Sequence, residues 1–142
     1  MDDRSFFAEI RRRLGCDEHR AEAITLVVFQ ELRDCLPEKE AADVAAQLPQ
    51  PLKNLWFEPG REGKPIEKTH RPELVARVRA RVPLHNDAET ERAIRAVFGA
   101  LQHLLRSSRG LEGEAWDVFS VLPKDLKTLW VDARGAGEPP CL

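Results

Sequence analysis

The sequence lacks tyrosine and is poor in aromatic residues, which make up 6% of its 142 positions. Proteins that bind single-stranded nucleic acid stack bases on aromatic side chains, so this composition speaks against that class. The formal net charge is −2 and the isoelectric point is about 6.1. Domains that coat DNA are basic, so general DNA binding is also disfavoured.

Long hydrophobic runs are absent as well. The most apolar stretch, residues 24–29, is far shorter than the roughly 20 residues that a membrane-spanning helix needs, so we predict no membrane span. Met1 is followed by acidic and basic residues, unlike a secretory signal. The cysteine number is odd and the spacings are unrelated, so we predict no disulfide framework and a cytoplasmic location. The three cysteines are Cys16, Cys35 and Cys141.

Motifs that carry chemistry are also missing. No nucleophile elbow surrounds any serine, and no glycine-rich phosphate loop is present. Cys16 and His19 have the spacing of a zinc-ligand pair, but a structural zinc site needs four ligands and no second pair follows. Most carboxylates lie at predicted helix starts or four residues from an arginine, as Glu91 does from Arg95, which is typical of solvated helix faces. We therefore predict no catalytic residue, no metal and no cofactor, and hence a protein that is not an enzyme.

What the chain does contain is an internal repeat. Residues 43–56 and 117–130 share eight of fourteen positions at a constant offset of 74. Upstream segments align at offsets of 68 and 70, so the second copy has gained residues near positions 16 and 38, where turns are expected. We interpret the pattern as a duplication.

Both copies have helical periodicity. Apolar residues recur at three- and four-residue steps over residues 6–14 and 74–82, and again over residues 24–36 and 94–105. Residues 24–29 have strand-like propensity, but the segments on both sides continue the helical period, which predicts a buried helix.

Turn and cap residues divide each copy into about four helices. We expect Gly15 to close the first helix, Asp17 to cap the second and Pro37 to begin the third. Pro49 and Pro123 break a helix and start a short fourth one that ends at Trp56 or Trp130.

The predicted fold is therefore all-α, with two similar modules packed as one compact domain around a pseudo-twofold axis. We assign residues 1–57 to the first module, 58–72 to a linker, 73–132 to the second module and 133–142 to a flexible tail. The linker and the tail are rich in glycine and proline. A duplicated chain buries the face that a homodimer would bury, so we expect a monomer, with a homodimer as the alternative.

The doubled motif resembles a known bacterial family. The resemblance lies in residues 13–15 (Arg-Leu-Gly), 36–37 (Leu-Pro), 46–57 and 122–130, the last with a Leu-Pro-x-x-Leu-x-x-Leu-Trp run. These segments are similar to those of the family called domain of unknown function 2267, over residues 5–131 of this chain. The resemblance implies an all-helical, soluble bacterial protein and implies no activity. The second copy departs from the first at residues 82–83 and 107–111.

Arginines form the first candidate site. Residues 4–13 and 71–81 each carry four arginines and one glutamate on a predicted helix, although the whole chain is slightly acidic. Such ridges are able to hold phosphates or an acidic partner. The alternative is a solvated helix face, in which arginine stems cover apolar neighbours. The ridge residues are Arg11, Arg12, Arg13, Arg77, Arg79 and Arg81.

Lysine and tryptophan form the second candidate site. Lys53 and Trp56 lie three residues apart on one helix face, and Lys127 and Trp130 repeat the pair. In one interpretation each tryptophan plugs the open end of its module beneath the lysine. In the other, the two pairs form a groove with an apolar floor and a cationic lip, suited to an acidic helix or a fatty carboxylate.

From these features we predict a non-catalytic interaction or ligand-binding module whose partner is a protein or a small apolar or acidic ligand. The alternative is a nucleic-acid-associated regulator that binds phosphates through the arginine ridges. An enzyme with an unrecognised site is the third possibility, and no convergent set of polar residues in the sequence favours it.

The plug interpretation makes a stability prediction. We expect Trp56→Ala and Trp130→Ala each to lower the free energy of unfolding by about 3–5 kcal/mol, as truncation of a buried tryptophan does. Leu48 and Leu122 should be buried too. Urea unfolding followed by circular dichroism measures the effect. If both variants unfold like the wild type, the tryptophans lie at the surface and the groove interpretation gains.

Overall fold

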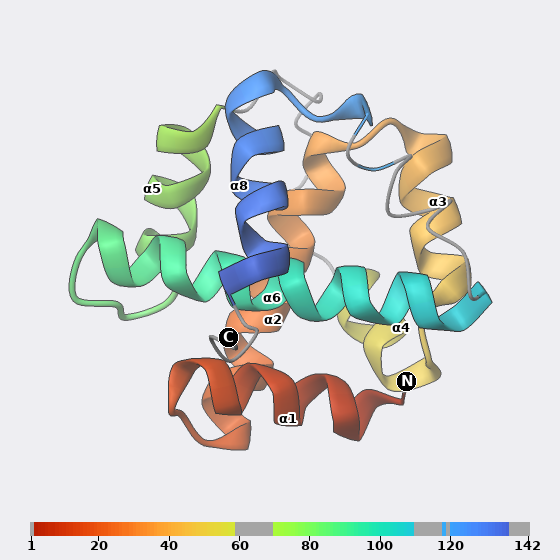
Figure 1. Ribbon diagram of the computed structural model, residues 1–142, viewed down its shortest axis with the longest axis horizontal. Helices are drawn as coiled ribbons and strands as arrows, with labels where there is room; N and C mark the ends of the chain where they lie inside the picture. The colour runs from red at the N-terminus through yellow and green to blue at the C-terminus, as the bar shows by residue number, and fades with distance from the viewer. Residues whose placement is uncertain (1, 59–69, 110–117, 119, 137–142) are drawn as a thin grey trace.

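Only α-helices form regular secondary structure in the computed structural model, which describes residues 2–58, 70–109, 118 and 120–136. The predicted all-α class is thus confirmed for the described part of the chain. In chain order the helices are α1 (Asp3–Leu14), α2 (Glu18–Cys35), α3 (Glu38–Gln47), α4 (Gln50–Trp56), α5 (Arg71–Arg81), α6 (Asp87–Arg109) and α8 (Lys124–Ala136) (Figure 1).

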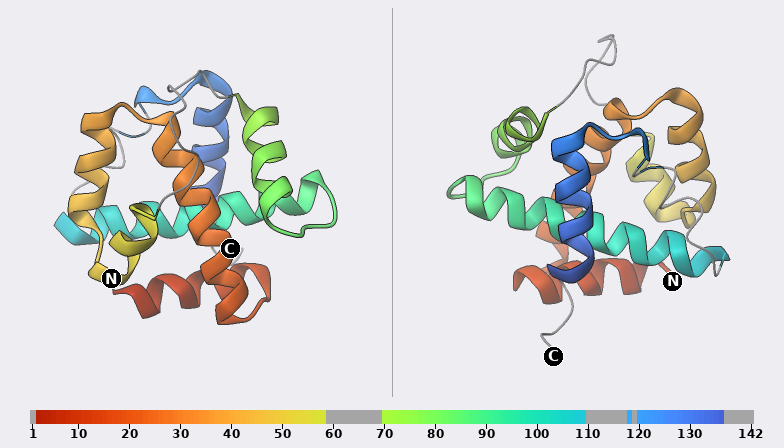
Figure 2. Two further views of the ribbon diagram at one scale, coloured as in Figure 1. Left: turned by 180° about the vertical axis from the view of Figure 1, so that it is seen from behind. Right: turned by 45° about the horizontal axis from the view of Figure 1, so that its top comes forward.

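Helix α6 is the centre of the arrangement. It lies between α8 on one face and α2 on the other, and α1 runs alongside it (Figures 1 and 2). Helix α5 packs on both α2 and α6, while α4 packs on α2. None of the helices in the described ranges is long and apolar enough to cross a membrane.

The caps at Gly15 and Asp17 are those that the sequence predicts. Asp17 accepts a hydrogen bond from the backbone N–H of Arg20 at 2.8 Å. Asn86, which was not among the predicted caps, does the same for Glu89 at the start of α6. Gly15 ends α1 with a φ of +66°, the left-handed conformation that glycine adopts without steric cost. These caps fix the two turns that lead into the long helices.

Several predicted boundaries shift by a few residues. Pro37 is the N-cap of α3 and not its first residue. Helix α5 begins at Arg71, inside the predicted linker, because Pro72 fits the first turn of a helix. Residues 59–69 of that linker lie outside the described residues.

The predicted start of a flexible tail at residue 133 is wrong. Helix α8 does not stop at Trp130 but continues to Ala136, and Ala133 is fully buried. The reason is a tertiary contact, because the carbonyl of Ala133 accepts a hydrogen bond from Arg13 at 3.2 Å. Residues 137–142 lie outside the described residues.

The core is one cluster of apolar side chains to which every described helix contributes. The strand-like segment at residues 24–29 is helical, as predicted, and five of its six side chains are buried. Its Thr25 hydroxyl donates to the carbonyl of Ala21 at 2.8 Å, which satisfies the hydroxyl within the helix. Burial therefore outweighs the weak strand preference of these residues.

Both repeat tryptophans are core residues. Trp56 packs edge-on against Phe29 of α2, with ring centroids 5.3 Å apart, and Trp130 packs against Phe98 of α6 at 5.1 Å. The backbone carbonyl of Trp56 accepts a hydrogen bond from Arg33, and that of Trp130 accepts one from Gln102. In each half the tryptophan helix is thus held on the long helix by a ring contact and a polar contact. Leu48 and Leu122 are buried as predicted.

The first helix of each predicted module contacts both long helices. Helix α1 packs on α2 and on α6, and α5 packs on α6 and on α2. The arrangement of the chain as two duplicated modules stays a prediction. The pseudo-twofold axis itself stays a prediction.

The conformation of Gly15 generates a stability prediction. A Cβ atom at this position meets no heavy atom within 4 Å, so the cost of Gly15→Ala is backbone strain alone. We expect this variant to lose about 1 kcal/mol of unfolding free energy in urea titrations. Gly15→Asn is the matched control, because asparagine tolerates the left-handed conformation, and it should lose less. Equal losses for both variants would contradict this explanation.

Candidate anion-binding pocket

The arginines of the second ridge are largely engaged within the protein. Arg77 and Arg81 on α5 both reach Glu31 on α2, at 2.6 Å and 3.5 Å respectively. The Glu31 side chain is 1% exposed, and a buried carboxylate is stable only when cations and hydrogen bonds compensate its charge. These two arginines therefore dock α5 on α2. Arg79 pairs with Asp87 at 2.9 Å, across the turn into α6.

The three arginines of the first ridge differ in exposure. Arg11 and Arg12 are exposed, whereas Arg13 points inward, and its side chain is only 11% exposed. Of the six predicted ridge residues, Arg13, Arg77, Arg79 and Arg81 thus hold helices together, which argues against two open phosphate-binding ridges.

The lysine–tryptophan groove is not what the structure favours either. Trp56 and Trp130 are 0% and 2% exposed, so the indole rings do not line an open surface. Lys53 and Lys127 are half-buried beside them. Both indole rings are buried, as the plug interpretation expects; that each closes the open end of a module stays a prediction.

Arg13 connects three helices. Its Nη2 lies 2.7 Å from Oε2 of Glu9, a nearly buried carboxylate whose Oε1 is 3.0 Å from Nδ1 of His103. Its Nη1 donates to the carbonyls of Ala133 on α8 and Arg95 on α6. The guanidinium crosses α6 at Gly99, where a Cβ atom would lie 1.9 Å from Nη1. Glycine is therefore required for this path.

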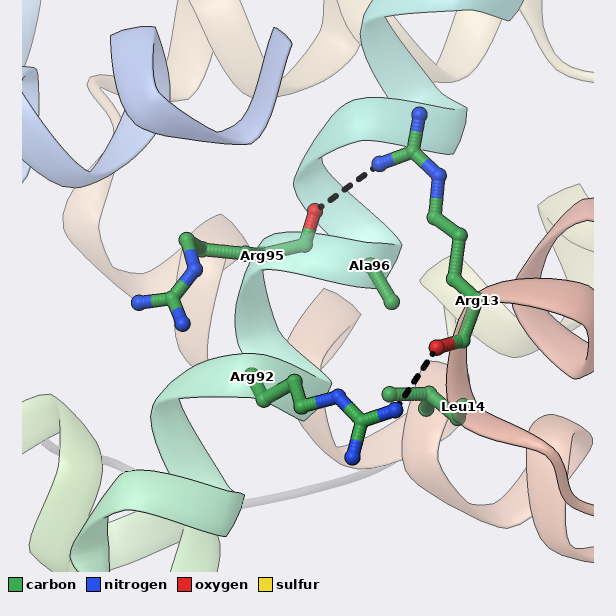
Figure 3. A pocket seen from close by; sticks show the side chains of 5 residues that line it. All are labelled: Arg13, Leu14, Arg92, Arg95 and Ala96. Atoms are coloured by element: carbon green, nitrogen blue, oxygen red, sulfur yellow. Dashed lines mark hydrogen bonds between the residues drawn. The ribbon is translucent and has the colours of Figure 1, made fainter. Parts of the chain in front are cut away.

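A cavity of about 190 Å³ opens beside this crossing. Arg13 reaches it from α1, and Arg92 and Arg95 come from neighbouring turns of α6 (Figure 3). Arg92 donates one hydrogen bond, to the carbonyl of Arg13 at 3.1 Å. Leu14 and Ala96 complete the wall.

The acidic groups near the cavity are used elsewhere. Glu91 lies 3.6 Å from Arg95 but accepts two shorter hydrogen bonds from Arg71, at 2.8 and 2.9 Å. The hydrogen bond from Arg71 holds the pKa of Glu91 below its usual range, and the same bond raises the pKa of Arg71. Glu9 is occupied by Arg13 and His103. Three arginines therefore line the cavity, and none of the described residues in its lining is a carboxylate. The guanidinium of Arg95 points away from those of Arg13 and Arg92 (Figure 3). A lining rich in arginine suits an anion.

A second cavity of about 70 Å³ adjoins the first and shares Leu14 and Arg92 with it. Cys16 lies in its wall, and burial raises the pKa of this thiol. The thiol is therefore protonated at neutral pH and is a poor nucleophile. Within the described ranges no group of three or more His, Cys, Asp or Glu side chains is arranged to hold a metal ion.

A comparison with known protein families identifies the family of this chain. A family model described as "Uncharacterized conserved protein (DUF2267)" matches residues 3–129. The chain belongs to this family. The resemblance predicted from the doubled motif is thereby confirmed. None of the curated proteins compared with this DUF2267 chain matches it.

Sequence reasoning missed Arg92 and Arg95 of the DUF2267 chain. Arg95 was interpreted as one half of a solvated pair with Glu91, and nothing local shows that Arg71, 20 residues earlier, binds that glutamate more closely. The sequence did contain one signal for this region of the structure. Arg13 lies in the last turn of its helix, next to Leu14 and the helix-ending Gly15, where a charged side chain lies close to the core.

The Arg71–Glu91 contact predicts a pH dependence. Folding lowers the pKa of Glu91 from its ordinary value of 4.5. Its stabilising contribution is therefore fully present above about pH 4.5 and is lost as the pH falls through the lower, folded-state pKa. We expect Glu91→Gln to be less stable than the wild type at neutral pH, with a difference that shrinks in urea titrations as the pH falls below about 4.5. Glu73→Gln, an exposed residue on α5, is the control. A difference that does not change with pH would contradict the assignment.

Proposed function

We propose that this DUF2267 protein is a non-catalytic ligand-binding module that holds a small anion in the pocket of Arg13, Arg92 and Arg95. The observation that carries this proposal is the set of three arginines that line one cavity while the nearby carboxylates of Glu91 and Glu9 are already paired. Charge-assisted hydrogen bonds from arginine are among the strongest contacts that a carboxylate or phosphate accepts.

The three arginines have different parts in this proposal. Arg13 is fixed by Glu9 and by two backbone carbonyls, so it supplies a rigid wall whose charge Glu9 compensates. Arg92 gives one hydrogen bond to a backbone carbonyl, and among the described residues Arg95 has a long contact with Glu91. The remaining N–H groups of Arg92 are the donors proposed to hold the ligand, and Arg95 adds positive charge to the same lining.

The alternative in which arginine ridges bind nucleic acid has less support. Arg77 and Arg81 are held by a buried glutamate and Arg79 by Asp87, so on α5 the ridge charge is compensated within the protein. Arg11 and Arg12 lie exposed on α1, and they serve below as the control.

Binding of inorganic phosphate, measured by calorimetry at low ionic strength, tests the proposal. We expect Arg92→Gln/Arg95→Gln to bind phosphate at least tenfold more weakly than the wild type, because it loses two charged donors. Arg11→Gln/Arg12→Gln removes the same charge from the exposed face of α1 and should bind like the wild type. Circular dichroism checks that both variants are folded.

Two results would overturn the proposal. One is a wild type that does not bind phosphate or acetate. The other is a loss of binding that is equal in the two double variants, because it would show a response to total charge and not to the pocket. A loss confined to Arg11→Gln/Arg12→Gln would favour the ridge on α1.

A further inference from the structure

The two adjoining cavities differ in chemical character. The larger is lined by three arginines, while the smaller has a mostly apolar wall. The apolar part of the smaller cavity is formed by Leu14, Cys16, Ile24, Leu84 and Ala93. Cys16 belongs to the apolar set because burial keeps its thiol protonated.

Two charged residues of the smaller cavity, Arg20 and Glu89, compensate each other's charge. Arg20 donates to the carbonyl of Pro83 at 2.7 Å and lies 3.9 Å from Glu89. Arg92 belongs to both cavities. The smaller cavity therefore offers no separate charged site, and its carboxylate from Glu89 disfavours a second anionic group there.

We infer that the ligand is a short-chain monocarboxylate, with its carboxylate at Arg92, which lines both cavities, and its hydrocarbon chain in the apolar cavity next to Ile24 and Leu84. This inference rests on the proposed function and adds the chemical class of the ligand. Leu14, in the wall of both cavities, marks the place where the head of the ligand joins its chain.

The cavity volume limits the chain length. One water molecule occupies about 10–15 Å³ of volume measured in this way, and the smaller cavity holds about 70 Å³. A chain of a few carbons fits this space, whereas a long fatty acyl chain does not. Each methylene that leaves water for an apolar site raises the affinity about fourfold.

The test measures binding of straight-chain carboxylates from acetate to octanoate by calorimetry, at one ionic strength. We expect the affinity of the wild type to rise about fourfold per carbon up to about hexanoate and then to level off. Leu84→Phe fills the apolar cavity from the segment before α6 and should remove the rise while leaving phosphate binding unchanged. Cys16→Met fills the cavity from the turn between α1 and α2 and should also remove the rise of affinity with chain length.

Leu55→Phe is the matched control, because Leu55 is a partly buried leucine on α4 and does not line either cavity. It should keep the chain-length dependence. If phosphate binding depends on Arg92 and Arg95 but affinity does not change with chain length, this inference is wrong and the proposed function stands. If hexanoate binds equally well to the wild type and to both filled variants, the inference is also wrong. A wild type that binds neither phosphate nor any carboxylate overturns both.

Discussion

The fold depends on the guanidinium group of Arg13, which occupies the space that a side chain at position 99 would otherwise fill. Arg13 passes over Gly99 and joins α1 to backbone carbonyls of α6 and α8, while Glu9 neutralises its charge. Because the carbonyls are peptide groups, the contact fixes backbones and not merely side chains. A buried pair of this kind is costly to break from one side, since the remaining charge is left without compensation.

A second buried carboxylate, that of Glu31 on α2, holds α5 in place. Glu31 holds Arg77 and Arg81, and through them α5, against α2. Helices α1 and α5 are both short, with basic residues in their last turns. Helix α5 is docked by salt bridges to Glu31, and α1 by the hydrogen bonds of Arg13 to backbone carbonyls of α6 and α8. Docking within the chain therefore accounts for Arg13, Arg77 and Arg81, while Arg11 and Arg12 remain exposed.

The sequence predicted what local interactions determine. The all-α class, the cap at Asp17, the turn at Gly15 and the burial of both tryptophans follow from residues close to one another along the chain. The pocket could not be predicted in this way. Arg13 and Arg92 are 79 residues apart, and a periodic pattern does not show which helix lies across another. The end of α8 was misjudged for the same reason, because Ala133 is held by a residue from α1.

The contacts of α1 and α5 with both long helices have a consequence for how the two halves of the chain are joined. Since α1 contacts α6 and α5 contacts α2, neither half contains all the surfaces that cover its own long helix. Each long helix is thus covered in part by a segment from the other end of the chain, and the buried apolar side chains form one cluster across both halves. A boundary drawn between the two repeats in the sequence is therefore not a boundary in the core.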